Sequence, residues 1–137
     1  MTNEIKTPKF FTAGNAKFTV SNPKGEHYTF RISRKEETQP FFVSLLSGPD
    51  NENSFTYMGL FNPDNNEVRL TRKSRYTDDT VPVRVVRWAL KAVAANKIPE
   101  GYVIQHAGCC CRCGRTLTTP ESIEAGIGPE CIKHVSW

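Results

Sequence analysis

Apolar and polar residues alternate at a period of two through the first half of the chain, which is typical of half-buried β-strands. The apolar members of the successive runs are Phe18 and Val20, then Tyr28, Phe30 and Ile32, then Phe41, Val43 and Leu45, then Phe55, Tyr57 and Phe61, then Val68 and Leu70. Segments rich in Pro, Gly, Asp and Asn separate several runs, for example residues 22–25 and 62–66. The pattern predicts about five antiparallel strands in a meander, with one apolar and one solvated face.

The period changes in the second half, because Val86, Leu90 and Val93 recur at helical spacing. Pro82 suits the first turn of such a helix. The opposite flank of this helix carries Arg84, Arg87 and Lys91. We therefore expect a helix that lays its apolar side on the sheet, presents basic side chains to solvent and ends at residues 98–101.

The composition is that of a globular protein with a modest core, because hydrophobic residues make up 38% of the chain and charged residues 23%. The sequence contains no apolar run of about 18 residues, the length needed to span a bilayer. Residues 1–9 are polar and lack the apolar core of a secretory signal. We therefore expect a cytoplasmic protein.

All five cysteines follow residue 108, and thiols in a reducing compartment are more often metal ligands or nucleophiles than disulfide partners. Cys110 and Cys113 are separated by two residues and followed by Gly114, which is the form of a zinc knuckle. Their thiolates can reach one ion, and the glycine permits the tight turn around it. Cys109 and Cys111 remain as spare thiols.

Cys131 is predicted to add a third thiolate from the N-terminus of a helix, where backbone dipoles favour the ionised form. A short helix that begins within residues 118–121 is expected to precede it. Tetrahedral zinc needs a fourth ligand. His134 lies three residues beyond Cys131 on the same helix face and is favoured by local geometry, whereas His106 lies four residues before Cys110.

A knuckle followed by a ligand-bearing helix is the treble-clef plan, so the expected fold class is α+β. It consists of an antiparallel β-meander with one packed helix, followed by a small treble-clef-like zinc domain. We expect the sheet and helix domain to span residues 1–98 and the zinc-binding domain residues 99–137, which a short strand at 102–105 would enter. A length of 137 residues fits one small domain with a metal-stabilised appendage.

The segment CRCGRTLTTPESIEAGIGPEC resembles a family of small zinc-binding domains of unknown function found in bacterial and phage proteins. Its recurring pattern is H-x-G-x-C-x-x-C-G-R-x-L-x-x-P-x-S-I-x-x-G-x-G-P-x-C. Chains of that family often stop soon after the last cysteine without a histidine there, so the resemblance implies that His106 is the fourth ligand. Weaker similarity covers residues 41–44, 48–53 and 72–75. The family implies no activity, and this chain departs from it in the extra thiols Cys109 and Cys111.

The thiols have alternative uses, among them a redox pair or a nucleophilic cysteine. A redox pair is expected in a thioredoxin-like fold, which the meander does not resemble, and a nucleophile needs a base and a cleft that the sequence does not reveal. A catalytic zinc would use a carboxylate base, for which the candidates are Glu121, Glu124 and Glu130. A structural Zn2+ is favoured because Ile123, Ile127 and Ile132 are nearly all the apolar residues of this segment.

Positive charge is concentrated between Arg69 and Arg115, although the net charge of the chain is only +4. The candidate nucleic-acid-binding residues are Arg72, Lys73, Arg75, Arg84, Arg87, Lys91, Arg112 and Arg115. These charges suit either a solvated surface or a footprint for nucleic acid. We expect a non-enzymatic, zinc-binding protein that binds nucleic acid, mainly at its phosphates. The alternative is a phage or mobile-element accessory protein that binds and inhibits a host defence protein.

Overall fold

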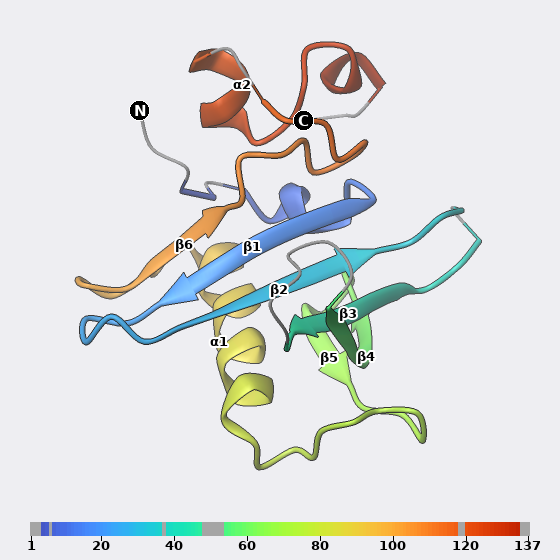
Figure 1. Cartoon of the computed structure of the whole chain (residues 1–137), viewed down its shortest axis with the longest axis vertical. Helices are drawn as coiled ribbons and strands as arrows, with labels where there is room; N and C mark the ends of the chain where they lie inside the picture. The colour runs from blue at the N-terminus through green and yellow to red at the C-terminus, as the bar shows by residue number, and fades with distance from the viewer. Residues whose placement is uncertain (1–3, 6, 37, 48–53, 118–119, 135–137) are drawn as a thin grey trace.

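The computed structural model describes residues 4–5, 7–36, 38–47, 54–117 and 120–134. The strands are β1 (Asn15–Ser21), β2 (His27–Ser33), β3 (Phe41–Leu46), β4 (Phe55–Asn62), β5 (Glu67–Arg69) and β6 (Val103–His106). The α-helices are α1 (Val81–Ala95) and α2 (Pro120–Ala125), and the 3-10 helices are η1 (Pro8–Thr12) and η2 (Cys131–His134). In Figure 1, α1 passes behind the sheet, while α2 and η2 lie together at one end of the long axis.

The described strands form one antiparallel sheet in the order β5-β4-β3-β2-β1-β6. Strands β1 to β5 lie beside their sequence neighbours, so the predicted meander of five strands is confirmed. Strand β6 pairs with β1 and places His106 opposite Phe18. The short strand expected before the cysteines is thus a sixth strand of the same sheet. Its pairing with β1 connects residues on either side of the domain boundary expected at residue 98.

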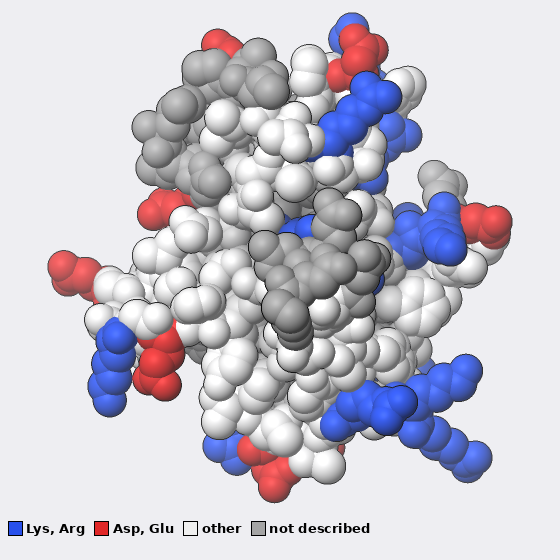
Figure 2. Space-filling view, in the orientation of Figure 1, with Lys and Arg blue, Asp and Glu red and all other residues white. Residues whose placement is uncertain are grey.

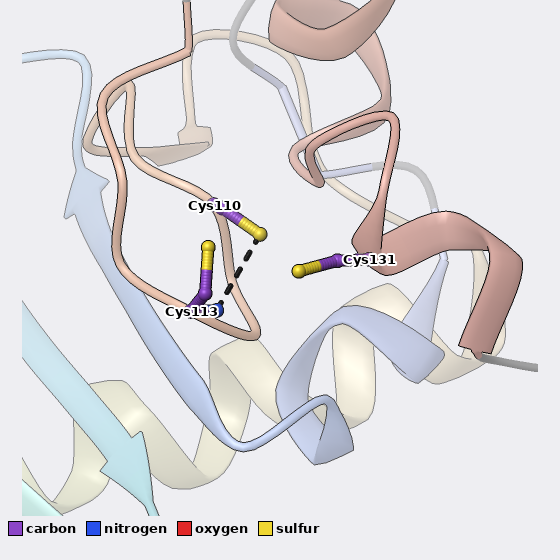
Figure 3. A group of neighbouring side chains, drawn as sticks. All are labelled: Cys110, Cys113 and Cys131. Carbon is purple, nitrogen blue, oxygen red and sulfur yellow. Dashed lines mark hydrogen bonds between the residues drawn. The ribbon is translucent and has the colours of Figure 1, made fainter.

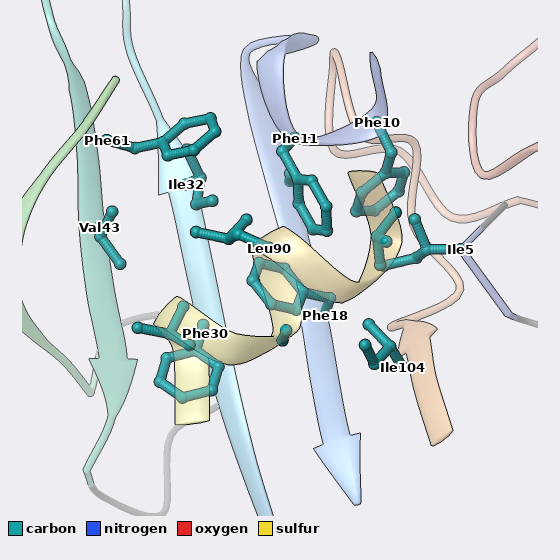
Figure 4. Close-up of a cluster of buried hydrophobic side chains, with 14 of the residues drawn as sticks. Ile5, Phe10, Phe11, Phe18, Phe30, Ile32, Val43, Phe61, Leu90 and Ile104 are labelled. Atoms are coloured by element: carbon teal, nitrogen blue, oxygen red, sulfur yellow. The ribbon is translucent and has the colours of Figure 1, made fainter. Parts of the chain in front are cut away.

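The apolar face of the sheet packs against α1 (Figure 4). Phe18 of β1 and Phe30 of β2 are fully buried there, and Leu90 packs on them from the helix. The residues whose spacing predicted the apolar side of the helix are all buried. The 3-10 helix η1 adds Phe11, whose ring centroid lies 4.9 Å from that of Phe18. These contacts explain why the alternating pattern of the first half forms a sheet with one buried face.

The other face of the sheet is turned toward the viewer in Figure 1, with α1 on the far side. Lys17 of β1 and Arg31 of β2 occupy outward positions there, between the buried residues of their strands. The Lys17 Nζ and the Arg31 guanidinium carbon lie 5.7 Å and 4.5 Å from the centroid of the Phe55 ring. This face therefore combines cations and aromatic rings.

The segment after β6 continues the hydrophobic core at the end of the sheet. Leu117, Ile127 and Cys131 are buried within the same cluster as the sheet residues. The backbone N–H of Asn15, at the start of β1, donates to the carbonyl of Cys111 at 2.7 Å. The sheet thus forms a platform for the cysteine-bearing segment. No helix among the described residues combines the length and apolar character needed to cross a membrane.

Candidate metal centre

Three cysteines from two separate elements meet beside η2 (Figure 3). Cys110 and Cys113 lie in the loop that follows β6, and Cys131 is the first residue of η2. Their sulfur atoms lie within 4.8 Å of one another and point into a shared space. Three sulfur atoms in this arrangement can hold one metal ion.

The loop that carries Cys110 and Cys113 is folded around the Cys110 sulfur. Backbone N–H groups of Arg112, Cys113 and Gly128 donate to this sulfur at 3.4, 3.5 and 3.2 Å. Gly114 has a φ of 82°, and a Cβ there would lie 2.9 Å from a neighbouring side-chain atom. A larger residue would be strained at this φ and would displace the side-chain amide of Asn15, which explains why glycine follows the second cysteine.

The pKa of the Cys110 thiol and that of the Cys131 thiol are shifted in opposite directions. Burial alone would raise the pKa of the Cys110 thiol, but the backbone N–H groups that donate to its sulfur lower its pKa to about 7. Burial raises the pKa of Cys131, a side-chain hydrogen bond with Arg112 offsets this in part, and the neighbouring Cys113 and Cys110 raise it further. Neighbouring thiolates repel each other, and a cation bound between the sulfur atoms would offset this repulsion. The geometry of the group is therefore compatible with one bound cation.

The two spare thiols stay outside this group, and all five cysteines lie in the described part of the chain. Cys111 is buried in the core, and burial raises the pKa of its thiol, which keeps it protonated. Cys109 pairs with Thr116 in an isolated β-bridge. The sequence left open which of the neighbouring cysteines form the knuckle. In the structure, Cys110 and Cys113 are the two that lie beside Cys131.

Neither His106 nor His134 belongs to this group of described side chains. The N–H of Gly108 donates to Nδ1 of the buried His106 at 2.9 Å, so Nε2 carries the proton and donates to the carbonyl of Ile123. Both ring nitrogens of His106 thus bind backbone groups, which differs from the ligand role expected for this residue. His106 instead fastens α2 to the end of β6. His134 is exposed at the end of η2.

The cysteine-bearing segment also has counterparts among known sequences. Residues 103–136 match the Family of unknown function (DUF6011). The match begins at β6 and includes all three cysteines of the group, whereas β1 to β5 and α1 lie outside it. No curated protein and no solved structure matches the chain. As the resemblance predicted, the segment matches a family of unknown function, and the match adds neither an activity nor a metal.

A cavity of about 410 Å3 opens beside the three cysteines. Among the carboxylates considered as a catalytic base, Glu130 lines this cavity, with an exposed side chain whose Oε1 lies 3.6 Å from Nζ of Lys133. Glu121 is exposed and is not part of the lining. The side chain of Glu124 lies outside the described structure. The described carboxylates therefore include no buried base at the centre.

The basic residues expected to form one surface lie at opposite ends of the long axis (Figure 1). One end carries the exposed residues Arg72, Lys73 and Arg75 in the loop between β5 and α1, and the other carries the exposed residues Arg112 and Arg115 near the cysteines. Arg84 and Lys91 are exposed on α1, as predicted. The structure therefore does not bring these residues together in one patch.

Arg87 was expected to face solvent, and the structure corrects this expectation. Its Nε and Nη2 donate to the carbonyl of Val68 in β5 at 3.1 and 2.9 Å, and Nη2 lies 2.8 Å from Oδ1 of Asp78. Strand β5 is at the edge of the sheet, where backbone carbonyls lack a strand partner on the outer side. The long arginine side chain reaches this edge, so Arg87 joins α1 to the sheet.

Arg112 lies instead beside cations that the sequence pattern did not single out. A hollow of about 590 Å3, here called the basic hollow, is lined by Arg31, Arg34, Lys35, Arg112 and Phe42, and no described acidic residue is part of its lining. Little in the sequence points to this grouping. Arg31 alternates with buried residues of β2, which predicts only that its side chain points outward. Figure 2 shows that Lys and Arg side chains on this face of the molecule gather mostly along one side.

Proposed function

We propose that the protein is a non-enzymatic, zinc-binding protein that binds nucleic acid through the basic hollow. Zn2+ is the proposed ion because it prefers thiolate ligands in a tetrahedral site, whereas Mg2+ and Ca2+ prefer oxygen. Cys110, Cys113 and Cys131 supply the thiolates, and the knuckle with the following helix η2 forms a treble-clef-like unit. The ion is structural, since it holds together a segment with few buried apolar side chains.

The nucleic-acid part of the proposal rests on the grouping of side chains in the basic hollow. Its four cations can neutralise phosphates without an opposing acid in the described lining. Phe42 stands beside them, is 37% exposed and offers a ring on which a base can stack. Cations with an exposed aromatic ring suit single strands, because unpaired bases are free to stack. This grouping is the observation that carries the proposal.

The proposal also links the metal to the binding surface. Arg112 lies between Cys111 and Cys113, and its own backbone N–H donates to the Cys110 sulfur. A metal bound at the thiols would therefore fix the position of this arginine at the rim of the basic hollow. We expect removal of the metal to weaken nucleic-acid binding as well as to loosen the segment.

The test measures binding of labelled single-stranded DNA, single-stranded RNA and duplex DNA over a range of salt concentrations. The test variant Arg34→Glu, Lys35→Glu, Arg112→Glu reverses three cations of the basic hollow. The control variant Arg72→Glu, Lys73→Glu, Arg75→Glu makes the same charge change at the opposite end of the molecule. Only the first should flatten the slope of log affinity against log salt, by about 2 units for three phosphate contacts on a single strand.

Phe42→Ala separates stacking from charge. It should weaken single-strand binding about fivefold or more without changing the salt slope, because a base stacked on an aromatic ring contributes about 1–3 kcal/mol. Equal loss in both charge variants would mean that net charge, rather than the basic hollow, attracts the polyanion. If no nucleic acid binds even at low salt, the proposal is wrong and binding to a host protein becomes the hypothesis to pursue.

A further inference from the structure

The cavity beside the cysteines is much larger than a metal ion requires. Its volume is about 410 Å3, whereas one water molecule occupies about 30 Å3 in the liquid. All three cysteines line it, together with the buried side chains of Leu117 and Ser122. An ion held by the thiols would therefore border a space with room for a small molecule.

The protein itself brings three sulfur ligands to this position, whereas tetrahedral zinc takes four ligands in all. Every cysteine and histidine of the sequence lies in the described part of the chain, so no further cysteine or histidine ligand lies outside it. His106 has both ring nitrogens bound to the backbone, and His134 is exposed and outside the group.

We infer that the metal is held by three thiolates and that its fourth coordination position faces the cavity, where it takes an exchangeable ligand with a neutral nitrogen donor. This inference rests on the proposed binding of zinc. A divalent ion with three thiolates carries a net charge of −1, so an anionic fourth ligand adds charge inside a partly enclosed cavity. An uncharged imidazole nitrogen avoids that cost and is a preferred ligand of zinc.

The experiment replaces zinc by Co2+, whose visible absorption bands report the number and type of ligands. Imidazole is titrated into the Co2+ protein, and acetate serves as an anionic oxygen donor of similar size. Imidazole should shift the bands with saturation at one molecule per ion, and acetate should bind at least about tenfold more weakly, which corresponds to 1.4 kcal/mol.

Two variants test where the ligand enters. Thr116 lines the cavity and is exposed, so Thr116→Trp should retain Co2+ but weaken the imidazole effect by at least about tenfold. His134→Ala should leave the starting spectrum and the imidazole titration unchanged. His27→Ala, at the exposed start of β2, is the matched control for loss of a histidine.

The possible failures have different meanings. A protein that binds no Co2+ contradicts the metal centre and with it the proposed zinc binding. A tetrahedral Co2+ spectrum that imidazole does not alter leaves the metal centre intact and overturns the exchangeable position. A changed starting spectrum in His134→Ala identifies that histidine as the fourth ligand, and stronger binding of acetate than of imidazole overturns the proposed ligand class.

Discussion

The sheet with α1 and the cysteine-bearing segment after β6 are stabilised in different ways. Phe11, Phe18 and Phe30 are fully buried between the sheet and α1, and burial of such a side chain contributes about 1.5–3 kcal/mol. In residues 107–134, the buried aliphatic side chains of the described structure are Leu117 and Ile127, and most other buried side chains are cysteines. Apolar packing is therefore extensive in the sheet and sparse in the segment, and the proposed metal would add to the few apolar contacts that the segment makes with the common core.

The two regions are nevertheless joined by specific hydrogen bonds. The N–H of Ala107 donates to the carbonyl of Lys17 in β1 at 3.2 Å, directly after the last residue of β6. The N–H of Asn15 donates to the carbonyl of Cys111. These contacts position the loop that carries Cys110 and Cys113 on the edge of the sheet. The sheet should therefore keep its fold when the segment loosens, and the segment should remain tethered to it.

The largest expected effect comes from Cys131→Ser, which removes one of the proposed metal ligands. Bound zinc should fall from about one per chain to near zero, because structural zinc sites contribute apparent free energies of about 10 kcal/mol or more. Residues 107–134 should then lose their protection from amide hydrogen exchange, while β1 to β3 keep theirs. Elemental analysis and hydrogen exchange measure these two results.

Cys109→Ser is the matched control, since this thiol lies outside the group formed by Cys110, Cys113 and Cys131. It should retain both the metal and the exchange protection. Equal damage from both substitutions would mean that another set of thiols binds the ion. Loss of protection throughout the sheet in Cys131→Ser would contradict the separation between the two regions.

A smaller effect is expected on the sheet side from Arg87→Ala. This change leaves the Val68 carbonyl without its arginine donor and should lower the free energy of unfolding by about 1–3 kcal/mol. Lys91→Ala removes the same charge from an exposed position of α1 and should change the free energy of unfolding by no more than about 0.5 kcal/mol. Urea unfolding measures both variants, and neither should lose metal. Identical unfolding curves would show that Arg87 contributes only to the charge of the surface.

The alternating pattern was sufficient to predict the meander, because residues such as Phe18 and Phe30 are inward-facing at every second position. The pairing of β6 with β1 was not predictable in the same way. A strand of four residues has too short a pattern to reveal its partner, and β6 lies more than 80 residues from β1 in the sequence. Such a long-range pairing depends on how α1 returns the chain to the edge of the sheet.

The cysteine spacing was also informative, since Cys110 and Cys113 are close in sequence and Cys131 begins a helical turn. The environments of single polar side chains were harder to predict. Whether His106 binds a metal or a backbone carbonyl depends on where α2 lies, and whether Arg87 faces solvent depends on the edge of β5. The basic hollow combines residues from β2, β3 and the knuckle, so no local pattern contains it.

The smallest expected effect is a pH dependence at the junction of the two regions. Burial lowers the pKa of His106 from its ordinary value near 6.5, and the bond to the Ile123 carbonyl offsets this only in part. A second proton would have to bind Nδ1, which accepts the N–H of Gly108, so protonation breaks that hydrogen bond. The unfolded chain binds this proton at higher pH than the folded chain. The contribution of His106 to the free energy of unfolding is therefore complete above about pH 6.5 and falls as the pH drops below it.

Urea unfolding of the wild type and of His106→Gln, at about pH 7.5 and at about pH 5.5, measures this contribution. Release of metal on acidification affects both proteins, so the difference between them reports the protonation of His106. The wild type should lose more stability than the variant on acidification, and equal losses would show that His106 keeps the same pKa in the folded and unfolded chains.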